Sequence, residues 1–264
     1  MDRYARMFDG LAQRDEGAFG AFVMLGDPDF QTSGEILDAL VEGGADMLEV
    51  GIPFSDPVAD GPVIQAAAER ALARGMTPAH CFQLLKAFRR RHPDIPVGIL
   101  TYANLVVARG ASHFYRAAAE AGVDSVLVAD VPLFEARPFA AEAQANGIAP
   151  VLIAAQNTPD DTLKEIAELG GGYTYCVARA GVTGAAEAKF DHGTLMQRLA
   201  ANQAPPPVLG FGISRPDHVE AALASGAAGV ISGSAIVKLI EEHGSDWRKP
   251  VTNFISAMKA ATRR

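Results

Sequence analysis

The sequence is poor in cysteine, which limits the kinds of fold and site that it can form. Its two cysteines, Cys81 and Cys176, lie far apart in a chain of 264 residues. A disulfide framework or a cysteine-ligated zinc site needs several cysteines at short, regular spacing. Neither feature is therefore expected.

Long apolar runs and an excess of positive charge are also missing. No stretch approaches the roughly 20 apolar residues of a membrane-spanning helix, and the first residues, MDRYARMF, contain no long apolar run. The net charge is −8, which argues against a general binder of nucleic acid or membranes. We expect a cytoplasmic protein that binds neither.

Several catalytic groups are absent from the positions where they would act. All lysines fall in expected helices or in one loop, whereas a Schiff-base aldolase needs a lysine at a strand end. The six histidines show no HxH or HxxxH spacing, so a metal site is not expected. The G-x-S-x-G motif of serine hydrolases does not occur.

Short apolar runs alternate with segments of helical spacing along the whole chain. The runs predict eight strands, at residues 20–25, 47–52, 97–102, 125–129, 149–154, 173–178, 207–212 and 228–232. Eight strand–helix units predict an α/β fold, a (β/α)8 TIM barrel forming a single domain over residues 1–264. The main alternative, a doubly wound open sheet, would need a glycine fingerprint after the first strand, and LGDPDF at 25–30 is not one.

One strand carries an acid where packing alone would favour valine or isoleucine. Residues 47–65 read MLEVGIPFSDPVADGPVIQ, with Glu49 inside the strand and Asp56 and Asp60 in the loop that follows. An edge-strand charge facing water is the ordinary interpretation of Glu49. Apolar residues on both sides argue against it, so we expect Glu49 to be a buried acid that handles protons.

The barrel fold predicts which residues surround this acid. Active sites of such barrels lie at the carboxyl ends of the strands, and the two-residue period places Met47, Glu49 and Gly51 on one face. If that face points inward, side chains from the first, third and sixth strands could surround Glu49, namely Phe22, Leu100, Tyr102, Tyr173 and Tyr175.

Glycine-rich loops after the seventh and eighth strands predict a phosphate site. They read GFGIS (210–214) and SGSAIVK (232–238), and Ser234 would begin a helix whose positive end attracts anions. A further loop at 178–190 has the length of a lid over the ligand. Carboxylates, tyrosines and a phosphate cradle together favour metal-free proton transfer on a phosphorylated substrate, with Glu49 as the acid and base.

Specific motifs across the chain resemble the tryptophan synthase α-subunit family. They are LEVGIPFSDPVADGP at 48–62, YANL at 102–105, DSVLVADVP at 124–132, RAGVTG at 179–184, GFGIS and GSAIVK. The resemblance covers nearly the whole chain and implies retro-aldol cleavage of indole-3-glycerol phosphate to indole and glyceraldehyde 3-phosphate.

The resemblance also implies roles for individual residues. Glu49 would protonate indole C3 and assist removal of the glycerol hydroxyl proton, while Asp60 would accept the indole N–H. Thr183 would help to fix Asp60 when the lid closes. The family's indole pocket corresponds to Phe22, Leu100, Tyr102 and Tyr175, and its phosphate site to Gly184, Phe211, Gly212, Gly233 and Ser234.

A partner is implied as well. The family's α subunit docks on a β subunit that carries pyridoxal phosphate, forming an αββα assembly, so no cofactor is expected on this chain. Pro53, Asp56 and Asn104 correspond to interface or communicating residues. Cys176 and Ala178, and the sequence IAAQNTPDD at 153–161, depart from common family residues and affect the pocket's shape and the lid rather than the two acids.

Three other functions remain open at this point. A free-standing lyase would release indole without a partner by means of the same acids. A catalytically silent regulatory subunit would have no need of Glu49 and Asp60. A different phosphate-binding barrel, such as an isomerase, would lack the loop PFSDPVADGP.

Overall fold

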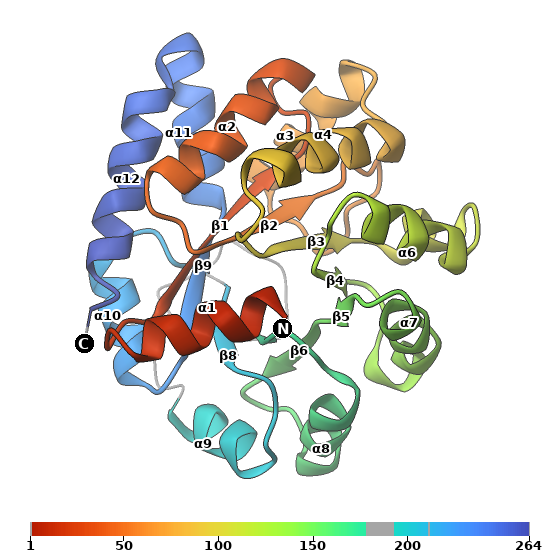
Figure 1. The fold of residues 1–264 in the computed structure, drawn as a ribbon, viewed down its shortest axis with the longest axis vertical. Helices are drawn as coiled ribbons and strands as arrows, with labels where there is room; N and C mark the ends of the chain where they lie inside the picture. The colour runs from red at the N-terminus through yellow and green to blue at the C-terminus, as the bar shows by residue number, and fades with distance from the viewer. Residues whose placement is uncertain (1, 178–192, 211, 264) are drawn as a thin grey trace.

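The computed structural model describes residues 2–177, 193–210 and 212–263 as parallel strands enclosed by helices (Figure 1). The strands form one sheet in the order β5-β4-β3-β2-β1-β9-β8-β7-β6, and all neighbouring pairs are parallel. Their bounds are β1 (Ala18–Met24), β2 (Met47–Gly51), β3 (Val97–Thr101), β4 (Ser125–Val128), β5 (Ala149–Pro150), β6 (Leu152–Ala155), β7 (Thr174–Val177), β8 (Pro207–Leu209) and β9 (Gly229–Ser232).

The sheet closes through the strand predicted at 149–154, which the structure divides into β5 and β6. Pro150 has no amide hydrogen with which to continue the ladder, and the next residue, Val151, donates its N–H to the carbonyl of Val126 at 3.0 Å. β5 pairs with β4 and β6 pairs with β7, so one interrupted strand joins both ends of the sheet. The predicted (β/α)8 barrel is confirmed; the prediction of an unbroken fifth strand is wrong.

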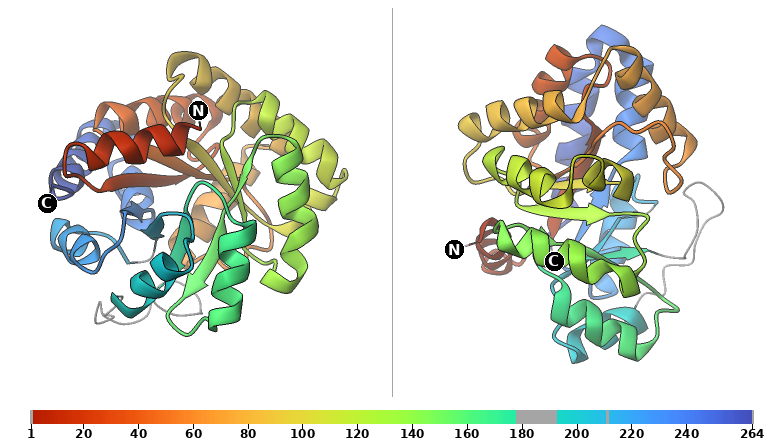
Figure 2. Two further views of the ribbon diagram at one scale, coloured as in Figure 1. Left: turned by 60° about the horizontal axis from the view of Figure 1, so that its bottom comes forward. Right: turned by 90° about the vertical axis from the view of Figure 1, so that its right-hand side faces the viewer.

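Helices surround the barrel, as the two further views also show (Figure 2). None of them, within the described residues, is long and apolar enough to cross a membrane. The helices are α1 (Arg3–Ala12), α2 (Phe30–Glu42), α3 (Pro62–Ala73), α4 (Pro78–Arg91), α5 (Ala103–Val107), α6 (Ala111–Glu120), α7 (Leu133–Ala145), α8 (Asp160–Leu169), α9 (Gly193–Ala201), α10 (Pro216–Ala224), α11 (Ser234–His243), the 3-10 turn η1 (Gly244–Asp246) and α12 (Arg248–Ala260).

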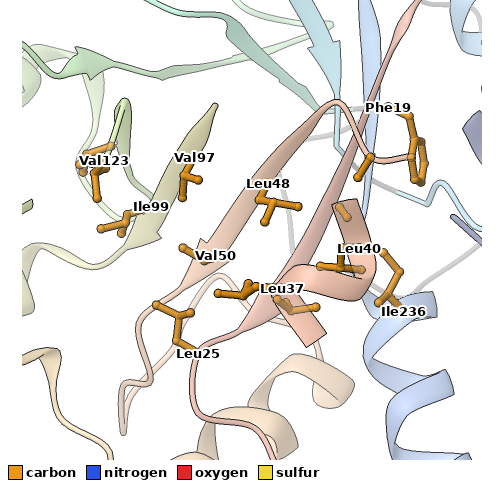
Figure 3. Close-up of a cluster of buried hydrophobic side chains, with 14 of the residues drawn as sticks. Phe19, Leu25, Leu37, Leu40, Leu48, Val50, Val97, Ile99, Val123 and Ile236 are labelled. Atoms are coloured by element: carbon orange, nitrogen blue, oxygen red, sulfur yellow. The ribbon is translucent and has the colours of Figure 1, made fainter. Parts of the chain in front are cut away.

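Successive side chains of a strand point to opposite sides, so each strand has an outer and an inner face. In this barrel both faces are apolar. On the outer face, Leu48 and Val50 of β2 share a buried cluster with Leu37 and Leu40 of α2 (Figure 3). A second buried cluster fills the inside of the barrel and includes Met47 of the same strand. A residue on the Met47 face of β2 therefore lies inside the barrel.

The first helix closes the end of the barrel at which the strands begin. Tyr4 of α1 is 1% exposed, and its hydroxyl lies 2.8 Å from the Ser125 hydroxyl at the start of β4. Its ring centre lies 5.4 Å from that of Tyr173, just before β7. With this end covered, ligand access is left to the opposite end, where the parallel strands finish.

Candidate active site

Glu49 lies inside the barrel, as the strand period predicted. The parallel register places it beside Phe22 of β1 and Gly98 of β3. The Glu49 side chain shares the inner face of β2 with Met47, and the residue is only 2% exposed. The alternation of side chains along β2 thus places a carboxyl group in an otherwise apolar interior.

The Glu49 carboxyl has one hydrogen-bonded oxygen and one free oxygen. Tyr173 donates its hydroxyl to Oε1 at 2.7 Å, whereas the buried Oε2 has no hydrogen-bond partner among the described residues. Burial raises the pKa of Glu49 to about 7 by disfavouring the charged form; the bond from Tyr173 acts in the opposite direction, and the charge of Asp60 adds to the rise. Glu49 can therefore both donate and accept a proton near neutral pH.

Asp60 stands at the end of the loop between β2 and α3. Gly61 precedes the helix and Pro62 occupies its first turn, which suits the fixed backbone angle of proline. The Asp60 carbonyl accepts a hydrogen bond from Gln65 Nε2 at 2.8 Å, which fixes the loop end to the helix. Asp60 is 8% exposed, and burial raises its pKa, while a hydrogen bond with Tyr102 lowers it. A second buried acid thus accompanies Glu49.

Aromatic side chains predicted to surround the acids are buried in the barrel. Phe22 and Tyr175 belong to the inner cluster, and Leu100 is half-buried against it. Tyr102, 2% exposed, stacks on Phe54 of the acidic loop at 5.3 Å between ring centres. The structure therefore brings the four predicted pocket residues to the same interior as Glu49.

Tyr175 also connects this interior to the segment after β8. Its hydroxyl donates to the carbonyl of Gly210 at 3.2 Å. A Cβ on Gly210 would lie 2.0 Å from the Tyr175 ring, so only glycine fits beneath that ring.

The predicted phosphate residues lie at the end of the barrel where β8 and β9 finish. Gly233 directly precedes α11, Ser234 is exposed in its first turn, and a Cβ on Gly233 would approach Phe22 to 3.1 Å. Gly212 is exposed and has a φ of +75°, a conformation that favours glycine. The first amides of α11 have no acceptors within the helix and, with its dipole, attract anions. Thr183, Gly184 and Phe211, like the predicted lid at 178–190, lie outside the described residues.

The predicted interface residues lie at the same end, Pro53 and Asp56 in the loop after β2 and Asn104 in the short helix α5. Pro53 is buried after β2, whereas Asp56 and Asn104 are exposed. Large apolar side chains are exposed in segments that follow the neighbouring strands β2, β3 and β4, with Val58 70%, Val107 50% and Phe134 78% exposed. We refer to Val58, Val107 and Phe134 as the apolar rim. The three side chains share the barrel end at which the strands finish, with the exposed Asp56 and Asn104.

Two features of this site were missed from the sequence. Tyr173 was expected only to stand near Glu49, although its hydroxyl is the direct hydrogen-bond partner of that acid. The apolar rim was not predicted at all, because its members are isolated in the sequence and only the order of the strands brings their segments together.

Comparison with known proteins gives consistent results along the chain. The family model for the tryptophan synthase alpha chain matches residues 8–263. The tryptophan synthase alpha chain of Serratia proteamaculans is 54% identical, with 100% of both chains covered. The solved structure of subunit alpha from Legionella pneumophila has a TM-score of 0.88 at 29% identity, covering 99% of this chain and 98% of that one. A chain of the tryptophan synthase a2b2 complex of Pyrococcus furiosus has a TM-score of 0.84 at 36% identity, covering 92% and 98%.

Proposed function

Because the chain belongs to the tryptophan synthase alpha chain family, we propose that it cleaves indole-3-glycerol phosphate to indole and glyceraldehyde 3-phosphate. The observation that carries this proposal is the Glu49 carboxyl, which is buried in the barrel with a pKa of about 7 and one oxygen free to meet a substrate. Asp60 supplies the second acid of a retro-aldol mechanism that needs no metal ion.

Glu49 acts first as an acid and then as a base. In its neutral form it gives a proton to C3 of the indole ring, which breaks the ring's aromaticity. The resulting carboxylate takes the proton of the glycerol hydroxyl on the carbon attached to C3. The bond between C3 and that carbon breaks, the carbon becomes the aldehyde, and the electron pair returns to the ring. Glu49 ends protonated, ready for the next turnover.

Asp60 accepts a hydrogen bond from the indole N–H and stabilises the positive charge that develops when C3 is protonated. Tyr102, hydrogen-bonded to Asp60, favours the ionised form of that carboxyl. Phe22, Leu100 and Tyr175 hold the indole ring between apolar walls.

The substrate phosphate binds at the first turn of α11, where Gly233 allows close approach and Ser234 offers a hydroxyl. The same barrel end contains Gly212, whose backbone conformation also suits an anion-binding loop. The family resemblance adds Gly184 and Phe211 to the proposed phosphate site. It also adds Thr183 as a residue that helps to fix Asp60.

A pyridoxal-phosphate β subunit is the proposed partner, in an αββα assembly like the a2b2 complex of the Pyrococcus furiosus relative. The apolar rim would supply its contact surface, together with Asp56 and Asn104, while Pro53 shapes the loop from beneath. The pyridoxal phosphate belongs to the partner in this proposal, so indole made here passes to the β subunit.

Indole release from indole-3-glycerol phosphate tests the proposal. We expect Glu49→Gln to lower kcat by about 100-fold or more, the size of a general acid–base contribution. Glu120→Gln is the matched control, because it makes the same chemical change at an exposed position of α6 and should leave kcat unchanged. Wild-type activity in Glu49→Gln would refute the proton-transfer role.

Each variant is measured with and without a β subunit. We expect slow turnover alone and strong activation by the partner. Full-speed turnover of the isolated chain would instead identify a free-standing lyase.

A further inference from the structure

A cavity of about 170 Å³ lies on the outer side of the barrel, between α7 and the strands β4, β5 and β6. Its wall is apolar and includes Val126 and Val128 of β4 and Ile153 of β6. Val126 belongs to the outer buried cluster, on the opposite face of the sheet from Glu49. Its lining also includes Val151 of the inner cluster, at the break between β5 and β6, but neither of the two acids and none of the four predicted pocket residues.

Two small side chains of α7 leave room for this space, beside the larger Leu133 and Phe139 of the same helix. Ala136 and Ala140 of α7 are buried toward the strands and line the cavity, whereas α2 fills the equivalent layer with Leu37 and Leu40. The cavity also lies over the point at which β5 ends and β6 begins, at Val151. The helix and the interrupted strand together leave a space that ordinary core packing would close.

The hydroxyl group of a largely buried tyrosine accompanies this cavity. Tyr115 of α6 is 1% exposed and lines the cavity, and its hydroxyl makes no hydrogen bond within the part of the chain that the structure describes. This oxygen is not among the fully buried polar atoms that lack a partner, so it is open to the cavity that the residue lines. Burial, together with the charge of Glu142, raises the pKa of Tyr115, so its hydroxyl keeps its proton at neutral pH. Among the side chains that line the cavity, that of Tyr115 carries the polar group and the others are apolar.

We propose that this cavity binds a small, mostly apolar ring compound that carries one hydrogen-bonding group, of the class of phenol or indole. A space of about 150 Å³ lined by apolar side chains is large enough to hold benzene, so a single or compact fused ring matches the 170 Å³ available. The ring occupies the apolar wall between α7 and β4, and its N–H or O–H pairs with the Tyr115 hydroxyl. This site is independent of the proposed cleavage reaction.

Methyl NMR spectra recorded during titration with benzene, phenol and indole test the proposal. We expect the methyl signals of Val126 and Val128 to shift with each compound, because these residues line the cavity. Val208 and Ile231 lie inside the barrel and report binding at the candidate active site instead. Shifts confined to Val208 and Ile231 would overturn the proposal.

Two variants separate the apolar wall from the hydroxyl. Ala140→Leu fills the cavity and should abolish the shifts of Val126 and Val128 with all three compounds. Ala141→Leu is the control, because it adds the same side chain to the exposed face of the same helix and should retain them. Binding of wild-type strength in Ala140→Leu would contradict the proposed location.

Tyr115→Phe keeps the ring and removes only the hydroxyl. We expect it to weaken phenol and indole about fivefold, the usual worth of one hydrogen bond, and to leave benzene unchanged. Equal affinities of wild type and Tyr115→Phe for all three compounds would refute the role of the hydroxyl. This comparison decides the question even if Ala140→Leu does not fold.

Discussion

Replacing Glu49 with glutamine is expected to stabilise the folded protein above neutral pH while it destroys activity. Glutamine has nearly the same shape and still accepts the hydrogen bond that Tyr173 donates at 2.7 Å. It differs in carrying no charge at any pH. The variant therefore removes the cost of holding a charged carboxylate in the barrel interior and leaves the packing around it intact.

The magnitude follows from the difference in pKa between the folded and the unfolded chain. The pKa of Glu49 is about 7 in the folded protein, against an ordinary value of 4.5. A raised pKa means that the folded state holds its proton more tightly, so stability is fully present below pH 4.5 and is lost as pH rises toward 7. The loss is about 1 kcal/mol at pH 5 and about 3 kcal/mol at pH 8.

Urea unfolding of wild type and Glu49→Gln at pH 5 and pH 8 measures this difference. We expect the stability gained by the variant to grow by about 2 kcal/mol between the two pH values. Glu120→Gln, exposed on α6, should show no such growth. A gain that is the same at both pH values, or that shrinks as pH rises, would show that Glu49 does not have a raised pKa.

Three further predictions concern groups around the site and the barrel's frame. Tyr173→Phe removes a bond that lowers the pKa of Glu49, so the alkaline limb of the kcat–pH profile should move upward by ~1 pH unit; a limb that stays in place or moves downward would contradict this. Gly210→Ala forces a Cβ to 2.0 Å from the Tyr175 ring, so KM for the substrate should rise in steady-state assays, and an unchanged KM would be evidence against that contact. Asp124→Ala removes a 7%-exposed carboxyl group that pairs with two arginines. The free energy of unfolding measured in urea should therefore fall by about 3 kcal/mol. A fall of less than ~1 kcal/mol would show that the pairing contributes little.

Regular local patterns made the fold predictable. Each of the eight apolar runs became a strand or, at 149–154, a strand interrupted after Pro150. Glycines with left-handed backbone angles follow the ends of α2 and α10, Gly44 with φ of +104° and Gly226 with φ of +97°. The interruption at Val151 was not predicted, since it depends on pairing with two different strands on either side of that residue.

The contacts of the site were less predictable than its position. The two-residue period of the strand placed Glu49 inside the barrel, because successive residues of a strand point to opposite faces. The hydrogen bond from Tyr173 joins residues 124 positions apart in the sequence. No local pattern contains such a contact, and a tyrosine in a buried strand has the same appearance whether it fills space or holds a catalytic acid.

The residues that sequence reasoning found most readily are those whose function costs stability. Glu49 drew notice because a carboxyl replaces an apolar side chain in a buried strand, and the same replacement accounts for the ~3 kcal/mol lost at pH 8. Tyr173, Tyr175 and Phe22 incur no such penalty, since aromatic rings pack well in a core whether or not they serve a ligand. An acid in a buried strand therefore indicates in the sequence that a site is present. The residues that line the site are identified only when the fold shows which core residues face that acid.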